Sequence, residues 1–355
     1  MTAPRVEVDL DAITANTRTL LDRLAPIGIR VTGVTKAALG SPDIAAAMEA
    51  GGVAALGDSR VDNLRRLRDD GPGLPLTLVR SPMRSQAAAV VGVAGVSLNS
   101  EAVVLGALAA AARDRGIHHA ALLMVELGDL REGVPAADLI DLARHVLTQP
   151  GLRLAGIGTN LACQAGATPD QAKMDELSLL ADRVEATLGT HIEIVSGGNS
   201  ANLDWALSTG DPGRVNDLRL GESILLGTEP LRRRSIAGLR TDAFELVAEV
   251  IEVQTKPAQP WGDIAQAAFG PAAKRMGTGS IRQAIVALGR QDADPADLMP
   301  PTGITVLGMS SDHLVLDVSD RDVEVGQELT FQPGYSSLVR AMTSPYVSQI
   351  FAGRR

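Results

Sequence analysis

A repeated alternation of short apolar runs and amphipathic segments constrains the fold of this chain more than any other feature of its sequence. Between residues 30 and about 228, each β-rich run is followed by a polar turn and by a segment with apolar residues at three- and four-residue spacing. The eight runs are IRVTGVTK, GVAALGDS, LPLTLVR, GVSLNS, AALLMVELG, LRLAGIGTN, HIEIVSGGN and DLRLG. Eight such α/β units with nearly continuous apolar strands predict a closed parallel (β/α)8 TIM barrel more readily than an open, doubly wound sheet.

The pattern changes after about residue 240. Runs such as FELVAEVIEVQ, HLVLDVSD and QELTFQP are separated by Gly, Pro and Asp turns, with no helical segment between them. We therefore predict two domains, a barrel over residues 1–235 and a C-terminal β domain over residues 236–355. RVEVDL, before the first helical segment, is predicted to be a strand that can join the β domain.

Composition and charge narrow the class of partner. The formal net charge of −9 disfavours nucleic acid, because sequence-independent binding depends on Lys and Arg releasing counterions from phosphates. The single cysteine, Cys163, excludes an intramolecular disulfide framework and gives no support for an oxidising compartment. The first residues lack the apolar core of a signal peptide, and the apolar run AVVLGALAAAA is too short to cross a bilayer. We expect a cytoplasmic enzyme with a small-molecule substrate and with neither nucleic acid nor a membrane as partner.

Polar residues stand at the carboxyl ends of the predicted strands, where the reactive groups of a (β/α)8 barrel lie. They are Lys36 after the first run, Arg131 after the fifth, Asn160 after the sixth, Ser196 to Ser200 after the seventh, and Arg219, Gly221 and Glu222 after the eighth. We expect these residues to share one site at one mouth of the barrel.

The lysine and the glycine-rich loop suggest specific chemistry. An ammonium at the end of an apolar strand is costly to bury, so Lys36 either reaches solvent or becomes a neutral amine that can form a Schiff base. The loops after the seventh and eighth strands are the usual phosphate site of this barrel. Gly198 admits backbone amides close to an anion, and Asn199 and Ser200 can donate hydrogen bonds to it. Taken alone, SGGNS is equally an ordinary βα turn with an N-cap serine.

A set of motifs extends over nearly the whole chain: VTKAALG, LGDLREGV, IGTNLAC, VSGGNSANL, LRLGESILLG, SSDHLVLDVSD and PGYSSLV. Together they resemble the ornithine racemase branch of the alanine racemase superfamily, which consists of fold-type III pyridoxal-phosphate enzymes. The resemblance implies an isomerase, a pyridoxal-phosphate-dependent amino-acid racemase that acts on ornithine, with lysine, alanine and serine as other substrates to consider. It also implies a head-to-tail homodimer in which each β domain contributes to the partner's active site.

Residue roles follow from this resemblance. Lys36 holds the cofactor covalently, Arg219 faces the pyridine nitrogen, and Arg131 lies near the phenolic oxygen and the substrate carboxylate. A permanent guanidinium opposes protonation of the pyridine nitrogen and so restrains transamination. Together with the polar residues at the strand ends, the predicted cofactor-binding set is Lys36, Arg131, Asn160, Ser196, Gly198, Asn199, Ser200, Arg219, Gly221, Glu222 and Tyr335.

The sequence departs from the family where alanine racemases supply their second acid/base group. Racemisation takes a proton from one face of Cα and returns one to the other, so Lys36 needs an opposing group. The family uses a tyrosine in a Ser-Tyr-Gly segment of the partner's β domain, and here that segment reads Ala268-Phe269-Gly270, whose ring cannot carry a proton. The phosphate-binding tyrosine of the lysine loop is also absent, since Leu39 and Gly40 stand there.

Two residues are candidates for the opposing acid/base group. Cys163 follows the sixth strand, where nearby cations favour a thiolate, although a lone cysteine is commonly inert packing. His313, in SSDH, lies in a segment that related enzymes present across the dimer interface, and imidazole exchanges protons near neutrality. Asp312 can orient His313 or bind a substrate amine, and a plain turn carboxylate is an equal alternative.

Rival functions share parts of this pattern. Asp312 and His313 have no further His or Cys at ligand spacing, so we predict no metal site, which disfavours zinc-assisted relatives such as D-threonine aldolase and D-serine dehydratase. Amino-acid decarboxylases use the same combination of barrel and β domain. Non-catalytic pyridoxal-phosphate carriers consist of the barrel alone, so the C-terminal domain counts against that function.

Overall fold

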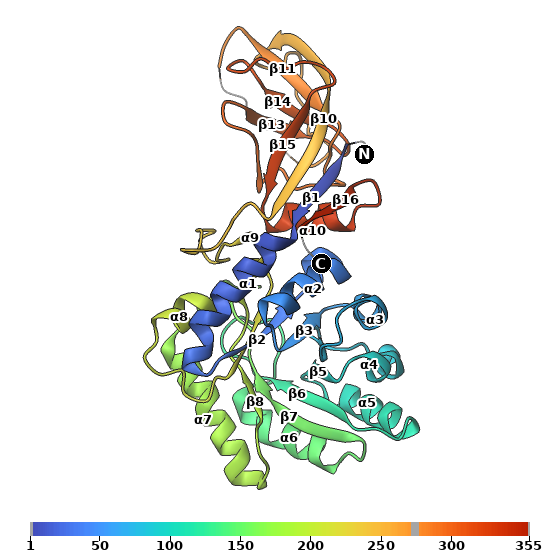
Figure 1. Ribbon diagram of the computed structural model, residues 1–355, viewed down its shortest axis with the longest axis vertical. Helices are drawn as coiled ribbons and strands as arrows, with labels where there is room; N and C mark the ends of the chain where they lie inside the picture. Colours follow the sequence, from blue (N-terminus) through green and yellow to red (C-terminus); the bar gives the residue numbers. More distant parts are fainter. Residues whose placement is uncertain (1–2, 271–276, 354–355) are drawn as a thin grey trace. The chain divides into compact units, whose positions relative to one another are not determined.

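The computed structural model describes residues 3–270 and 277–353, and the chain divides into two compact units (Figure 1). One unit is Asp11–Thr241, and the other combines Met1–Leu10 with Asp242–Gly353. Residues 236–241 stay with the first unit because they are bonded to its first helix: Asn16 Nδ2 donates to the Arg240 carbonyl at 2.9 Å, and Arg23 Nη2 donates to the Ala237 carbonyl at 2.7 Å.

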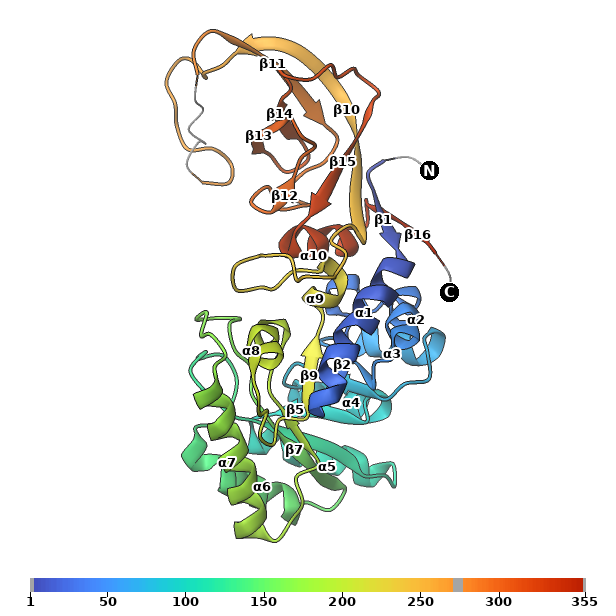
Figure 2. The same ribbon diagram turned by 60° about the vertical axis from the view of Figure 1, so that its left-hand side comes forward.

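The first unit is a closed eight-stranded parallel barrel, so the predicted fold is confirmed and the open sheet is excluded (Figure 2). Its strands are β2 (Arg30–Val34), β3 (Ala55–Asp58), β4 (Leu76–Leu78), β5 (Val96–Asn99), β6 (His119–Met124), β7 (Leu152–Gly158), β8 (Ile194–Ser196) and β9 (Asp217–Leu220). Closure pairs β9 with β2, and therefore the last strand lies beside the first. The predicted apolar runs become the strands because both of their faces are covered, and every residue of β6 is buried.

Helices surround the barrel strands (Figure 2). They are α1 (Leu10–Leu24), α2 (Pro42–Gly51), α3 (Val61–Asp70), α4 (Ala87–Val93), α5 (Ala102–Asp114), α6 (Leu139–Thr148), α7 (Gln171–Leu188), α8 (Leu203–Ser208) and α9 (Glu222–Leu226). A Cβ on Gly33 would lie 3.0 Å from Met48 Sδ of α2, so Gly33 faces the helix layer. By strand alternation, Thr32 and Val34 face the barrel interior.

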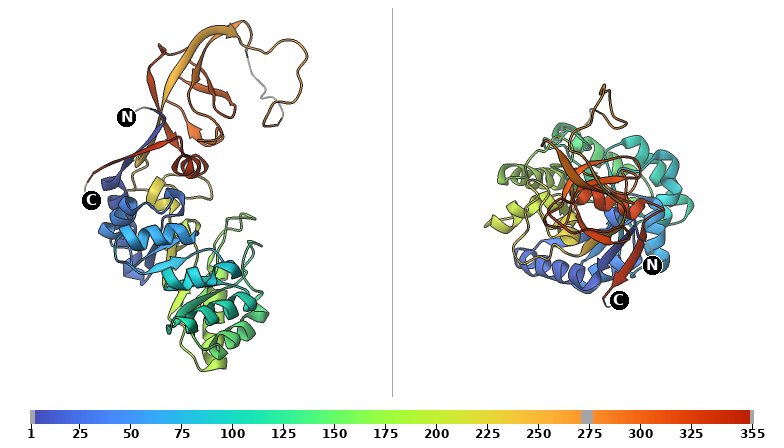
Figure 3. Two further views of the ribbon diagram at one scale, coloured as in Figure 1. Left: turned by 90° about the vertical axis from the view of Figure 1, so that its right-hand side faces the viewer. Right: turned by 90° about the horizontal axis from the view of Figure 1, so that it is seen from above.

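The second unit is an antiparallel β domain, as predicted (Figure 3). Its strand order is β12 (Leu298–Met299), β15 (Glu328–Pro333), β10 (Phe244–Pro257), β11 (Ser280–Val286), β14 (Leu314–Asp317) and β13 (Thr305–Met309). The N-terminal β1 (Arg5–Asp9) pairs antiparallel with β10 and parallel with β16 (Ser348–Ala352). β1 therefore belongs to the sheet of the β domain.

Among the residues of the β domain that the structure describes, one helix is present, contrary to the expectation of a helix-free region. α10 (Tyr335–Thr343) follows β15. Leu338, Ala341 and Met342 are buried at helical spacing, which explains why this segment is not a strand. Among the described residues, no helix combines the length and apolar character that a membrane span requires.

Candidate active site

Lys36 lies on the loop after β2, and hydrogen bonds fix the residue before it. Thr35, the residue before it, donates from Oγ1 to Asp58 Oδ2 at 2.8 Å. Asp58 is buried at the end of β3 and also accepts from the Arg60 amide at 2.9 Å and from Asn63 Nδ2 at 3.0 Å. Burial raises the pKa of the Asp58 carboxyl, and these hydrogen bonds oppose that rise. The Lys36 side chain itself is exposed and has no hydrogen bond or ion pair within the described residues.

The loops after β8 and β9 are joined to each other and approach β2. Ser200 Oγ lies 3.0 Å from Ser223 Oγ and accepts from the Ser223 amide at 3.2 Å. Gly198 has φ +140°, and a Cβ there would lie 2.2 Å from Asn202 Oδ1, so only glycine fits. A Cβ on Gly221 would lie 3.0 Å from the carbonyl oxygen of Val34, two residues before Lys36. The glycine-bearing loops and the lysine strand therefore meet at one mouth of the barrel.

Arg219 is the most enclosed cation of this site. It lies on β9 with 6% of its surface exposed, and burial lowers the pKa of its guanidinium. Nη1 donates to Ser196 Oγ, and Nη2 donates to the Thr159 carbonyl at 2.7 Å. Ser196, on β8, donates in turn to Asp217 Oδ2. The guanidinium is therefore held by β8 and by Thr159, the residue that follows β7.

Arg131, after β6, is held by the adjacent Glu132. Its Nε and Nη2 both donate to the Glu132 carboxylate, with 2.6 Å between Nη2 and Oε1, and this interaction raises the pKa of Arg131. Electrostatic interactions extend from Arg131 to Cys163, and from Arg219 to Glu132, Arg131 and Cys163. Two arginines, one carboxylate and the thiol therefore lie in one neighbourhood.

Cys163 is positioned by its surroundings. Asn199 Nδ2 donates to the Cys163 sulfur at 3.4 Å, to the Leu161 carbonyl at 2.8 Å and to Asn160 Oδ1 at 3.0 Å. The Asn199 amide group thus ties the β8 loop to the β7 loop. The Asn160 Nδ2 atom is buried and has no hydrogen-bond partner among the described residues.

The loop that carries Cys163 is fixed by one buried carboxylate. Asp129, with 0% of its surface exposed, accepts from the backbone amides of Cys163, Gln164 and Ala165 at 3.0 to 3.1 Å. These three bonds join the loop after β7 to the loop after β6. The thiol is therefore presented by a segment with a defined backbone conformation.

Four other predicted site residues lie outside the barrel strands. Glu222 begins α9 and forms an ion pair with Arg233. Asp312, His313 and Tyr335 belong to the β domain unit and not to the barrel. The His313 Nδ1 and Asp312 Oδ1 atoms lie 2.8 Å apart on an exposed turn, and hydrogen bonding to His313 lowers the pKa of Asp312.

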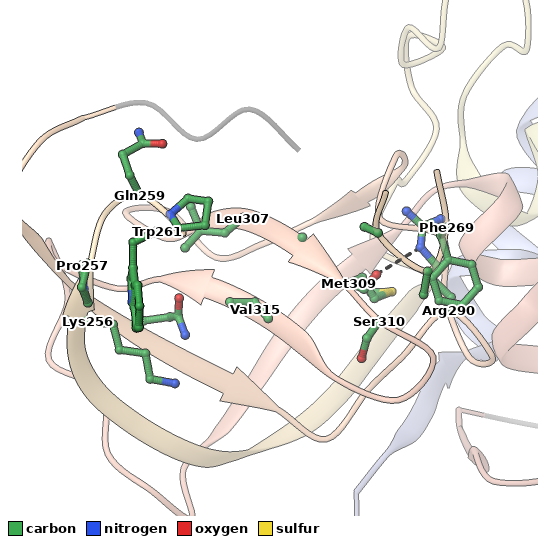
Figure 4. Close-up of a pocket in the computed structure, with 15 residues that line it drawn as sticks. Lys256, Pro257, Gln259, Trp261, Phe269, Arg290, Leu307, Met309, Ser310 and Val315 are labelled. Atoms are coloured by element: carbon green, nitrogen blue, oxygen red, sulfur yellow. Dashed lines mark hydrogen bonds between the residues drawn. The ribbon is translucent and has the colours of Figure 1, made fainter. Parts of the chain in front are cut away.

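Phe269, in the Ala268-Phe269-Gly270 segment, lies beside a cavity of the β domain. The cavity has a volume of about 520 Å³, and its lining includes Trp261, Phe269, Leu307 and Arg290 (Figure 4). The Arg290 guanidinium carbon lies 5.0 Å from the centre of the Phe269 ring. The ring is 53% exposed and carries no group that can transfer a proton.

Sequence reasoning missed three buried residues that organise the site: Thr32, Asp129 and Asp217. Asp217 stands two positions before Arg219 on a short strand, so strand alternation alone places both on one face. Asp129 lies in a loop, and nothing in its neighbourhood along the sequence indicates the amides that it binds.

Comparison with known proteins gives this arrangement its family. Residues 8–230 match the family described as alanine racemase, N-terminal domain. The chain is 37% identical to the lysine racemase of Thermotoga maritima over 99% of both chains. It is 34% identical to the ornithine racemase of Acetoanaerobium sticklandii over 98% of this chain and 99% of that one. The chain belongs to the alanine racemase family. It is a pyridoxal-phosphate-dependent amino-acid racemase, an isomerase.

Solved structures of alanine racemases share the fold of this racemase. The enzyme from the D-cycloserine producer Streptomyces lavendulae superposes with a TM-score of 0.80 at 22% identity, over 100% of this chain and 98% of that chain. The Bartonella henselae enzyme with covalently bound pyridoxal phosphate gives a TM-score of 0.73 at 17% identity, over 99% of this chain and 100% of that chain.

The residues at the barrel mouth fit pyridoxal phosphate. Its aldehyde requires an amine, and Lys36 offers one that is exposed and uncommitted within the described residues. Its phosphate requires donors close to the backbone, and the loops that contain Gly198 and Gly221 lie at this mouth of the barrel. The Nδ2 atom of Asn160, which has no partner among the described residues, and the remaining N–H groups of Arg219 supply further donors.

Proposed function

We propose that this racemase acts on a diamino acid, ornithine or lysine, at the mouth of the barrel. The names of the two full-length relatives support this substrate class. The observation that carries the assignment of the site is the meeting of the β2 loop, with its exposed Lys36 amine, and the β9 strand, with the buried Arg219 guanidinium.

Each residue has a defined task in this proposal. Lys36 holds the cofactor and exchanges the Cα proton on one face of the substrate. Arg131 binds the substrate carboxylate in place of Glu132, and Arg219 faces the pyridine nitrogen. The loops around Gly198, Ser200 and Gly221, with Tyr335, hold the phosphate. Once bound, the cofactor spreads the negative charge that develops at Cα.

Cys163 is our candidate for the opposing acid/base group. Its loop is pinned by Asp129, its sulfur accepts a hydrogen bond from Asn199, and it interacts electrostatically with both Arg131 and Arg219. The thiolate is the form of cysteine that accepts a proton.

His313 is the alternative, with Asp312 as its orienting partner or as a ligand for the distal substrate amine. This alternative requires a head-to-tail homodimer that brings the β domain of one subunit to the barrel of the other, which we also propose. A cytoplasmic location stays a prediction.

Replacing Lys36 tests the assignment. In Lys36→Ala we expect loss of the visible absorbance band of the bound cofactor, and loss of deuterium incorporation at Cα of ornithine and lysine in deuterium oxide. Lys256→Ala is the matched control, since Lys256 is paired with Glu252 in the β domain. Retention of the band in Lys36→Ala would refute the role of Lys36. Release of carbon dioxide in place of Cα exchange would indicate a decarboxylase.

A further inference from the structure

A buried carboxylate accompanies Arg219 on the same strand. Asp217 and Arg219 are separated by one residue on β9, so their side chains leave the same face of the barrel. They are 8% and 6% exposed, respectively. A buried cation is costly unless an opposite charge or several acceptors compensate for lost water. The position of Asp217 therefore requires a physical explanation of its own.

A hydroxyl connects the two charges. Ser196 Oγ donates to Asp217 Oδ2 and accepts from Arg219 Nη1. The other carboxylate oxygen, Asp217 Oδ1, accepts from Thr32 Oγ1 at 2.9 Å. Thr32 lies on β2, the strand that leads to Lys36. One chain of hydrogen bonds thus links strands β2, β9 and β8.

The charges around Arg219 make Asp217 its main compensating group. Burial lowers the pKa of Arg219, and the largest opposing influence is the negative charge of Asp217. Glu132 and Cys163 also raise the pKa of Arg219, more weakly than Asp217 does, and Arg131 lowers it. Glu132 is already engaged by Arg131. Asp217 is consequently the nearby carboxylate whose hydrogen bonds lead to the Arg219 guanidinium.

We propose that Asp217 is a positioning residue that acts through Ser196 to fix the orientation of the Arg219 guanidinium and to supply its counter-charge. Thr32 holds the carboxylate in the rotamer that reaches Ser196. Because Asp217 reaches Arg219 through the Ser196 hydroxyl, other N–H groups of Arg219 can face a bound molecule. A direct two-point ion pair with the carboxylate would occupy those N–H groups. The expected effect on catalysis rests on the role proposed above for Arg219. The hydrogen bonds that orient Arg219 can be measured whether or not that role is correct.

Asp217→Asn tests the proposal because it keeps the shape of the side chain and removes its charge. In protein labelled with [15N]arginine, with the Arg219 signal assigned from Arg219→Lys, we expect the Arg219 guanidinium protons to exchange with water about tenfold faster in Asp217→Asn. In the holoenzyme we expect kcat to fall about tenfold while KM for ornithine or lysine changes little, since the orientation of a group facing the cofactor is what is lost.

The matched control is Asp182→Asn, which also removes an arginine's partner, but on α7, where Asp182 pairs with Arg214. Asp182→Asn should alter the guanidinium proton exchange of Arg214 and leave that of Arg219 unchanged. Ser196→Ala is the second test, and should speed Arg219 exchange although the charge of Asp217 is kept. Unchanged Arg219 exchange in Asp217→Asn, or in Ser196→Ala if the first variant does not fold, would overturn the proposal. Failure of the Lys36 experiment would instead contradict the proposed site and leave these exchange rates interpretable.

Discussion

Removing the carboxylate of Asp129 should release the loop that carries Cys163. In Asp129→Ala the backbone amides of Cys163, Gln164 and Ala165 lose the acceptors that they now reach at 3.0 to 3.1 Å. A hydrogen bond to a charged acceptor is worth roughly 1.5 kcal/mol when well buried, and about 1 kcal/mol is reasonable at these part-exposed amides. The three together amount to about 3 kcal/mol of local stability, which corresponds to roughly a hundredfold increase in local opening.

Hydrogen exchange measures this effect directly. We expect the amides of residues 163 to 165 to exchange about a hundredfold faster in Asp129→Ala, with little change in the barrel strands. Glu126→Gln is the matched control, because Glu126 accepts from the Gly128 amide in the loop after β6 and makes no bond to residues 163 to 165. Equal protection of these three amides in wild-type and Asp129→Ala protein would show that Asp129 does not hold the loop.

Two further predictions concern pH and the second acid/base group. Burial lowers the pKa of His119 to about 4. As the pH falls below 6.5, the unfolded chain therefore binds a proton at His119 before the folded chain does. The free energy of unfolding should fall by about 3 kcal/mol as the pH is lowered from 6.5 to 4. His119→Gln should flatten this part of the curve in denaturant titrations at each pH; an identical slope in both proteins would exclude His119 as the cause. If Cys163 serves the face opposite Lys36, Cys163→Ala should slow racemisation by roughly 10²–10⁴-fold yet still exchange the Cα hydrogen of one enantiomer, as followed by proton NMR in deuterium oxide. The same pattern in His313→Asn, with Cys163→Ala active, would assign the role to His313.

The strand ends explain why so much of the site could be predicted. Lys36, Arg131, Asn160 and Arg219 each follow or end an apolar run, and a closed parallel barrel brings all such ends to one mouth. Once the eightfold alternation predicts the barrel, sequence position alone is enough to group these residues.

The contacts that hold these site residues in place could not be predicted from sequence position. Asp129 binds amides more than thirty positions along the chain. The side-chain amide of Asn199 bridges to Asn160 and Cys163, and the position of Asn199 in the sequence does not reveal these contacts. α10 was missed because the turn-rich pattern around it is typical of a β domain. In each case the deciding partner is distant in sequence, so local pattern carries no information about it.

The amino-acid sequence by itself determined the repeating α/β units, the separate β domain and the residue types at the strand ends, because periodicity and burial are local consequences of composition. Only the tertiary structure decided that β9 closes against β2, which places the lysine strand beside the arginine strand. It also decided that Asp217 reaches Arg219 through Ser196. Such contacts depend on barrel closure and strand register, which are fixed by the packing of the whole unit and by no single segment.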